Sequence, residues 1–192
     1  MLQIARTTRA AALRRPAEVH DLCAIREKRH RALVAEARDE LIRGDEENAL
    51  GLCMSALRLD RSYEALSLAG TLSAILGHLE DSVRFTSEAI ETEPTRADAY
   101  YDLGSTLMDM GRAVEAVSWL KRGVDLLGRR DDDLVDFMCS ARIEALAVVG
   151  RLDEAAEALE DARRRTDDPL GLIDAAEEAL EERRDRPRLR LV

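Results

Sequence analysis

The stretch AYYDLGSTLMDMGRAVEAVSWLKRGVDLL runs from Ala99 to Leu127 and contains two amphipathic segments on either side of Gly111. Apolar residues recur three and four positions apart in both segments, which is the periodicity of a helix with one buried face. A glycine in the left-handed conformation commonly ends a helix. The stretch therefore predicts a helix, a turn at Gly111 and a second helix.

The turn glycine recurs along the chain at a nearly constant interval. Gly44, Gly77, Gly111 and Gly150 each lie between two amphipathic stretches, with spacings of 33, 34 and 39 residues. A helix–turn–helix unit with a period close to 34 residues indicates a stacked helical array. Each pair of helices buries one face on its neighbours, so such an array is stable only as a stack.

Small residues recur at two further places in these units, where they allow neighbouring helices to approach closely. They are Ala37, Gly70 and Gly104 in the first helices and Ala49, Ala116 and Ala155 in the second helices. Together with the turn glycines, these residues resemble the tetratricopeptide repeat (TPR) family over roughly Arg29 to Asp168. Ser73 and Thr86 depart from the pattern because they are polar where the family has bulky groups, and we expect weaker packing there.

The resemblance implies an all-α fold, a right-handed α-α superhelix of about four helix–turn–helix repeats with a C-terminal capping helix. The repeats are expected at about residues 30–62, 63–96, 97–130 and 134–168, within an array that covers residues 17–168. A basic, frayed tail over residues 1–16 is expected before the array, and a capping helix over 169–184 and a tail over 185–192 after it. We also expect a separate helix from Glu18 to Lys28, ahead of the first repeat.

The composition agrees with a helical protein and argues against several function classes. Apolar residues make up 46% of the chain, charged residues 35% and aromatic residues 3%, which favours packed helices over strands. The net charge of -10 disfavours general nucleic-acid binding, and no apolar run is long enough to span a membrane. Three widely separated cysteines favour a cytoplasmic protein over a disulfide framework. Arginine outnumbers lysine 27 to 2, which is typical of GC-rich coding and favours a bacterial source.

Motifs for catalysis, cofactors or metals are not found in the sequence. It contains no glycine-rich phosphate loop, and its three histidines have no ligand spacing. His20 and Cys23 share a helix face, but two ligands do not make a zinc site. Cys53 and Cys139 fall at core places of the repeat, where they are expected to be small apolar fillers. We therefore expect no enzyme activity, no cofactor and no metal site.

The resemblance implies a binding groove on the concave surface, lined by the first helix of each repeat. The groove residues expected from the family pattern are Arg31, Val34, Arg38, Ser67, Thr71, Tyr101, Ser105, Met108, Ser140 and Glu144, with Phe137 at a further concave place. The lysine and asparagine clamp with which some family members bind a C-terminal carboxylate is absent. Tyr101 and Arg38 are the expected anchors, since tyrosine and arginine concentrate binding energy at interfaces.

The leading functional hypothesis is a non-enzymatic scaffold that binds a peptide or protein segment in this groove. A small cytosolic chaperone for a secreted or assembled client is a second hypothesis. A third is a regulatory module that uses the basic N-terminal arm, whose first 17 residues contain four arginines and no acidic residue. Formation of a homodimer through the terminal helices also stays open.

Overall fold

The computed structural model describes residues 16–127, 133–168 and 171–185, and these residues form helices joined by short turns, without a strand. The helices are α1 (Pro16–Arg43), α2 (Glu46–Leu57), α3 (Tyr63–Ile75), α4 (Leu79–Thr92), α5 (Ala97–Asp109), α6 (Ala113–Leu127), α7 (Asp133–Val148), α8 (Leu152–Arg165) and α9 (Leu172–Asp185). Residues 1–15 and 186–192, which make up most of the two predicted tails, lie outside the described residues. Among the described helices, none is both long and apolar enough to cross a bilayer.

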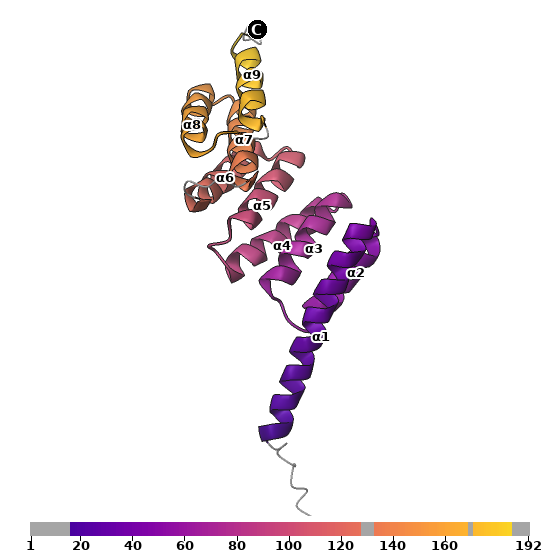
Figure 1. The fold of residues 1–192 in the computed structure, drawn as a ribbon. Coiled ribbons are helices and arrows are strands. Elements are labelled where there is room, and N and C mark those ends of the chain that lie inside the picture. Colours follow the sequence, from indigo (N-terminus) through magenta and orange to yellow (C-terminus); the bar gives the residue numbers. More distant parts are fainter. Residues whose placement is uncertain (1–15, 128–132, 169–170, 186–192) are drawn as a thin grey trace, which may run out of the picture.

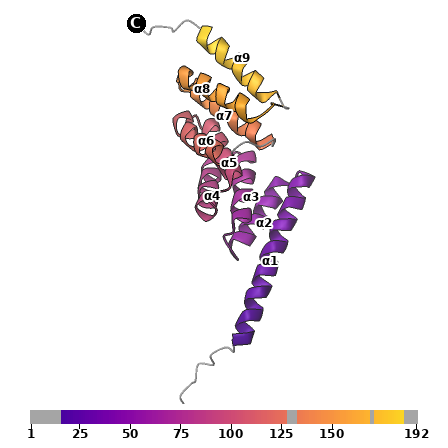
Figure 2. The ribbon, with the colours of Figure 1, turned by 60° about the vertical axis from the view of Figure 1, so that its left-hand side comes forward.

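The helices stack in consecutive pairs along one direction, from α1 at one end to α9 at the other (Figure 1). Within each pair the two helices pack together, and the second helix of a pair also packs against the first helix of the next pair. A view turned by 60° shows the same succession along the stack (Figure 2). This arrangement confirms the predicted all-α repeat solenoid, whereas the proposed repeat boundaries stay a prediction.

The turn between the helices of a pair has the same hydrogen-bonded geometry wherever the recurring glycine lies. At Gly111, where φ is 71°, the glycine N–H donates to the carbonyl of Met108 at 2.9 Å, and the N–H of Arg112 donates to the carbonyl of Leu107 at 2.8 Å. This pair of bonds is the Schellman motif, which satisfies the last carbonyls of a helix. A left-handed φ is strained for residues with a side chain, so glycine sets the place at which each first helix ends.

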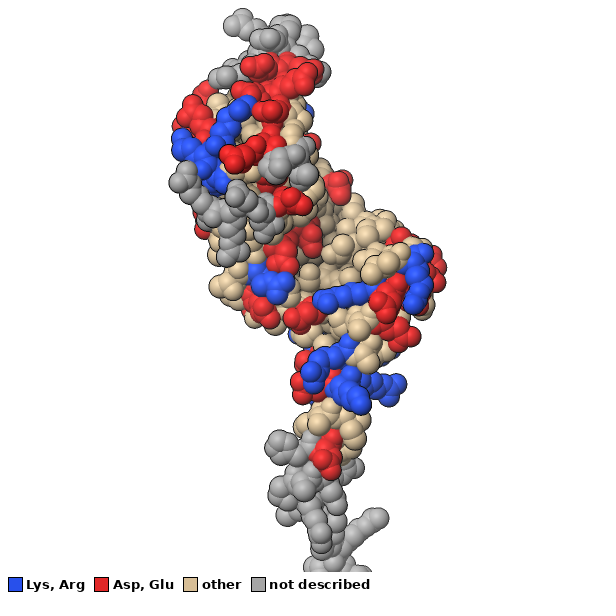
Figure 3. Space-filling view, in the orientation of Figure 1, with Lys and Arg blue, Asp and Glu red and all other residues tan. Residues whose placement is uncertain are grey.

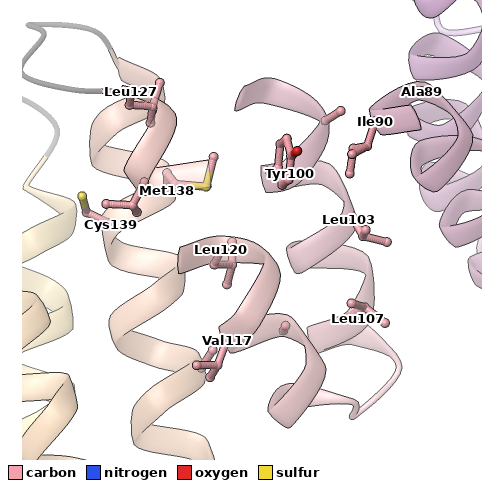
Figure 4. Close-up of a cluster of buried hydrophobic side chains, with 14 of the residues drawn as sticks. Ala89, Ile90, Tyr100, Leu103, Leu107, Val117, Leu120, Leu127, Met138 and Cys139 are labelled. Atoms are coloured by element: carbon pink, nitrogen blue, oxygen red, sulfur yellow. The ribbon is translucent and has the colours of Figure 1, made fainter. Parts of the chain in front are cut away.

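The core runs through the array as one continuous cluster of buried side chains. In its central part, Tyr100, Leu103 and Leu107 of α5 pack with Leu120 of α6 and Met138 of α7 (Figure 4). Cys53 and Cys139 are 0% and 4% exposed, which confirms their predicted place in the core.

The second pair of helices contains the two polar core residues that depart from the family pattern. Ser73 and Thr86 are each 1% exposed, and neither hydroxyl has a hydrogen-bond partner among the described residues. A Cβ atom added at Gly70 would clash with the hydroxyl oxygen of Thr86, so α3 and α4 approach closely at this point. The close approach of α3 and α4 does not show the weaker packing that was expected here, whereas the burial of two unpartnered hydroxyls is itself a cost to stability.

The N-terminal helix differs from the expectation. We expected a helix from Glu18 to Lys28 and a separate first repeat, but α1 is a single helix from Pro16 to Arg43. No glycine or proline lies between Pro16 and Gly44, so nothing in the backbone chemistry ends the helix near Lys28. The N-terminal part of α1 extends beyond the rest of the array (Figures 1 and 2), and Leu22 and Ile25 on it are 48% and 62% exposed.

The last helix closes the other end of the array. α9 packs against α7 and α8 and buries Ile173 and Leu180, which are 1% and 2% exposed. The carboxylate of Asp168 accepts hydrogen bonds from the N–H groups of Ile173 at 3.0 Å and Asp174 at 2.9 Å. A carboxylate that accepts from the first N–H groups of a helix stabilises its start, as expected for a helix that covers the last apolar face of the stack.

Candidate functional site

The two sets of helices form different faces of the array. The first helices of successive pairs contact one another, α1 with α3, α3 with α5, α5 with α7 and α7 with α9, whereas no contacts join α2, α4, α6 and α8 to one another within the described residues. The first helices are therefore closer together, and they line the inner side of the curved stack. We call this side, formed by α1, α3, α5 and α7, the inner face.

All ten predicted groove residues lie on these four helices. Arg31, Val34 and Arg38 are on α1, Ser67 and Thr71 on α3, Tyr101, Ser105 and Met108 on α5, and Ser140 and Glu144 on α7. Most of them are exposed or partly exposed, and Val34 is the exception. Val34 is 6% exposed and belongs to the core, so we remove it from the binding residues.

Two aromatic rings meet where α5 and α7 approach each other. The rings of Tyr101 and Phe137 are tilted at 53°, and their centroids are 5.9 Å apart. Tilted pairs at this distance are a favourable arrangement of aromatic quadrupoles. Phe137 is 40% exposed. The pair therefore offers a fixed apolar surface near the middle of the inner face.

Asp102 joins α5 to α3 beside this aromatic pair. The hydroxyl of Thr71 donates to Asp102 Oδ2 at 3.1 Å and also lies 3.1 Å from the carbonyl of Ser67. Burial raises the pKa of Asp102 to about 6, and the nearby carboxylate of Asp98 acts in the same direction, while the hydrogen bond from Thr71 opposes it. An aspartate whose ionised form is destabilised in this way gains from a cation beside it.

Further carboxylates surround Tyr101. Its pKa is raised chiefly by burial, and the negative charges of Asp102, Asp109 and Glu144 add to that shift, whereas a hydrogen bond with Ser105 opposes it. Each of these negative charges disfavours a second one on the phenolate. The middle of the inner face is thus aromatic and acidic.

The two ends of the inner face differ, with cations at the α1 end and a hollow at the other. Arg31 forms an exposed ion pair with Glu27 at 3.2 Å, and the exposed Arg38 lies about two helical turns further along α1. At the other end, a hollow of about 280 Å³ separates α7 from α9, with Ser140 and Glu144 on one side and Arg183 on the other. Alanines of α9 form much of its floor. The hollow continues the inner face beyond the last helix pair.

The buried cysteines and His30 offer little support for catalysis. Burial raises the pKa of the Cys53 thiol to about 12 and that of Cys139 to about 11, so both thiols are protonated near neutral pH and are poor nucleophiles. His30 is 6% exposed and lies 3.3 Å from the Ser62 hydroxyl. Within residues 16–127, 133–168 and 171–185, no three histidine, cysteine, aspartate or glutamate side chains are placed to hold a metal ion.

Sequence reasoning missed Asp102 and Asp109 as parts of this face. Both lie next to positions of the family pattern, one residue after Tyr101 and one after Met108. Phe137 was placed on the concave surface by the resemblance, but its ring contact with Tyr101 could not be read from the sequence. For Asp102 and Asp109, the only signal in the sequence was their spacing of seven residues along α5.

No protein-family model matches the chain, and no curated protein matches it either. Solved structures do match. MamA from Desulfovibrio magneticus RS-1 is 19% identical with a TM-score of 0.63, over 81% of this chain and 89% of that chain. YrrB, described as a TPR protein with an unusual peptide-binding site, is 22% identical with a TM-score of 0.62, over 80% of this chain and 78% of that chain.

An enzyme is also among the similar structures. A mutant of the Thermobaculum terrenum O-GlcNAc transferase is 22% identical with a TM-score of 0.62, over 73% of this chain but only 26% of that chain. At these identities the likeness concerns the fold. It shows that the array has the tetratricopeptide-repeat fold, in agreement with the resemblance found in the sequence.

Proposed function

We propose that this chain is a non-enzymatic scaffold that binds a segment of another protein along its inner face. The observation that carries the proposal is the aromatic pair of Tyr101 and Phe137, held partly exposed between α5 and α7. Rigid, partly exposed aromatic rings are the usual anchors of protein interfaces. Phe137 is 40% exposed beside polar groups, and a partner that covered its ring would remove this apolar surface from water.

The shape of the inner face suits an elongated occupant. Side chains of four successive first helices line it, so a ligand could contact several pairs at once. An extended or helical protein segment matches such a surface better than a small molecule does. The description of YrrB as a protein with a peptide-binding site supports the same class of ligand.

The compartment and assembly state are part of the proposal. We infer a cytoplasmic, bacterial protein from its three free cysteines and its arginine-rich composition. The exposed Leu22 and Ile25 on α1 favour self-association through that helix. Light scattering of wild type and of the Leu22→Ser, Ile25→Ser variant decides this point, since a monomeric wild type at high concentration excludes it.

The binding proposal is tested by affinity purification from the native host with the wild-type chain and the Arg38→Glu, Tyr101→Ala variant as baits. The matched control carries a charge reversal and a truncation on the outer helix α6, Lys121→Glu and Val114→Ala, both at exposed positions. Equal helicity of the three baits is checked by circular dichroism. A partner that wild type and control retain and the inner-face variant loses supports the proposal.

A partner that all three baits retain equally contradicts it. The binding surface would then be the outer face or one of the termini. A captured client that aggregates when alone would favour the chaperone hypothesis, whereas loss of binding to anionic surfaces after deletion of residues 1–16 would favour the regulatory arm.

A further inference from the structure

Charge is distributed unevenly along the inner face. The exposed cations Arg31 and Arg38 lie at its α1 end, whereas the part formed by α5 and α7 carries Asp102, Asp109 and Glu144. Among the ion pairs of the described residues, none involves any of these three carboxylates. Other acidic side chains of the array, among them Glu40, Asp81 and Asp161, do form ion pairs with arginines of their own helix. The middle of the inner face therefore has uncompensated negative charge.

The aromatic residues show the same contrast. The chain has six of them, and four have a guanidinium of this chain over the ring. Arg84 lies 4.3 Å from the ring centre of Phe85, Arg96 4.3 Å from that of Tyr63, and Arg122 4.6 and 5.2 Å from those of Trp119 and Tyr100.

The two rings without such a partner, among the described residues, are Tyr101 and Phe137. They are also the two that meet on the inner face, beside the unpaired carboxylates. The negative face of an aromatic ring attracts cations, and a carboxylate nearby adds to that attraction. An arginine or lysine of a ligand placed here would complete the arrangement that the chain itself makes at its other four rings.

We propose that the middle of the inner face, formed by Tyr101, Phe137, Asp102, Asp109 and Glu144, binds an arginine- or lysine-bearing segment of a partner protein. The inference rests on the proposed function and specifies the chemistry of its ligand. The cation lies against the aromatic pair, the carboxylates of α5 and α7 surround it, and Arg31 and Arg38 at one end repel a segment that is basic throughout. The ligand is thus a segment with a cationic centre rather than a uniformly basic one.

The surrounding charge agrees with this partner. On the face shown in Figure 3, acidic side chains cluster at the α9 end of the array, and cationic side chains cluster where α1 leaves it. The net charge of -10 attracts a cationic segment over a longer range and raises its rate of association. This general attraction is distinct from recognition at the inner face, and the experiment has to separate the two.

The test measures binding of labelled synthetic peptides by fluorescence anisotropy. One peptide carries arginines between apolar residues at its centre, and a second has glutamates in place of the arginines. A third is the peptide of residues 1–16 of this chain. The protein is wild type, Tyr101→Ala, the charge variant Asp109→Asn, Glu144→Gln, and a control that removes two exposed carboxylates from the outer helix α4, Glu80→Gln, Glu91→Gln.

We expect the arginine peptide to bind wild type and the control about equally. Its affinity should fall on the order of tenfold in Tyr101→Ala and in the inner-face charge variant, as is typical for loss of an interface anchor. The glutamate peptide should not bind detectably. Equal weakening by the inner-face and control charge variants would mean non-specific attraction and would overturn the inference.

The remaining outcomes separate the inference from the proposed function. Binding of the glutamate peptide that Tyr101→Ala abolishes would leave the inner face as the binding site and refute the cationic ligand. Tighter binding of the 1–16 peptide than of the arginine peptide would replace the partner protein by this chain's own N-terminal segment. If no peptide binds in a way that depends on Tyr101, the inference fails, while the purification experiment still decides the proposed function.

Discussion

Gly104 on α5 offers the sharpest test of how closely the helices of a pair approach. The residue is buried, and a Cβ atom added there would lie 2.5 Å from both Cγ and Cδ2 of Leu120 on α6. Leu120 is itself 0% exposed, so its side chain cannot move out into solvent. The change Gly104→Ala therefore forces α5 and α6 apart or strains Leu120.

The expected magnitude is the difference between two effects. Overpacking by one carbon costs about 1–3 kcal/mol in a well-packed core, whereas alanine stabilises a helix by up to about 1 kcal/mol relative to glycine. With the full helix gain subtracted, the net loss in the free energy of unfolding is about 0–2 kcal/mol. For a chain of this length, the upper end of that range lowers the melting temperature by roughly 4–8 °C.

Gly51 on α2 supplies a matched control with the same chemical change. A Cβ atom added at Gly51 would meet nothing within 4 Å, and the residue is exposed. Gly51→Ala is therefore expected to stabilise the protein by about 0.5–1 kcal/mol through helix propensity alone. The same change from glycine to alanine is thus expected to lower the stability at Gly104 and to raise it at Gly51.

Urea unfolding followed by far-UV circular dichroism measures both changes against wild type. Lower stability of Gly104→Ala together with higher stability of Gly51→Ala is the expected result. A Gly104→Ala variant as stable as Gly51→Ala would show that α5 and α6 are not in the close contact described, and the packing argument for the small residues of the repeat would be refuted.

Three further outcomes follow from buried polar and apolar groups. Thr86→Val removes an unpartnered buried hydroxyl and should raise the urea midpoint, with a gain of about 1 kcal/mol. Thr106→Val should lower the midpoint, because the Thr106 hydroxyl donates to the carbonyl of Asp102 at 2.8 Å. Equal effects of the two changes would contradict the distinction between a partnered and an unpartnered hydroxyl. The pKa of Asp102 is raised to about 6, so its ionisation destabilises the native state as pH rises from about 4 to 6. Asp102→Asn should therefore gain stability over wild type across that range, up to about 3 kcal/mol, and a difference independent of pH would refute the burial argument. Leu180→Ala should cost about 2–4 kcal/mol by opening a cavity under α9, and unchanged melting would show that α9 does not cover the array.

Much of the fold followed from residues whose roles are local. The backbone itself requires a glycine at each turn and a small residue at each close approach of two helices. The spacing of Gly104 and Gly111 therefore predicted the packing of α5 on α6. The continuity of α1 was missed for the opposite reason. The repeat period suggested a boundary near residue 30, but the uninterrupted helix-forming sequence after Pro16 was the stronger signal.

The inner face was less predictable because it depends on how separate helix pairs sit against each other. The family pattern places Tyr101 and Phe137 on the same surface, but the distance between their rings is set by the packing of α5 on α7. The role of Asp102 depends on Thr71 of another pair, which no local pattern reveals. The pattern also included Val34, whose burial follows from the packing of α1 on its neighbours.

The most direct test of the central claim is site-specific photo-crosslinking to the partner identified by purification. A photoreactive phenylalanine analogue is placed at position 101 on α5 and, in a separate protein, at position 118 on the exposed side of the outer helix α6. Crosslinks from position 101 and none from position 118 are expected if the inner face binds the partner. Crosslinks from position 118 alone would place the partner on the outer face and contradict the account.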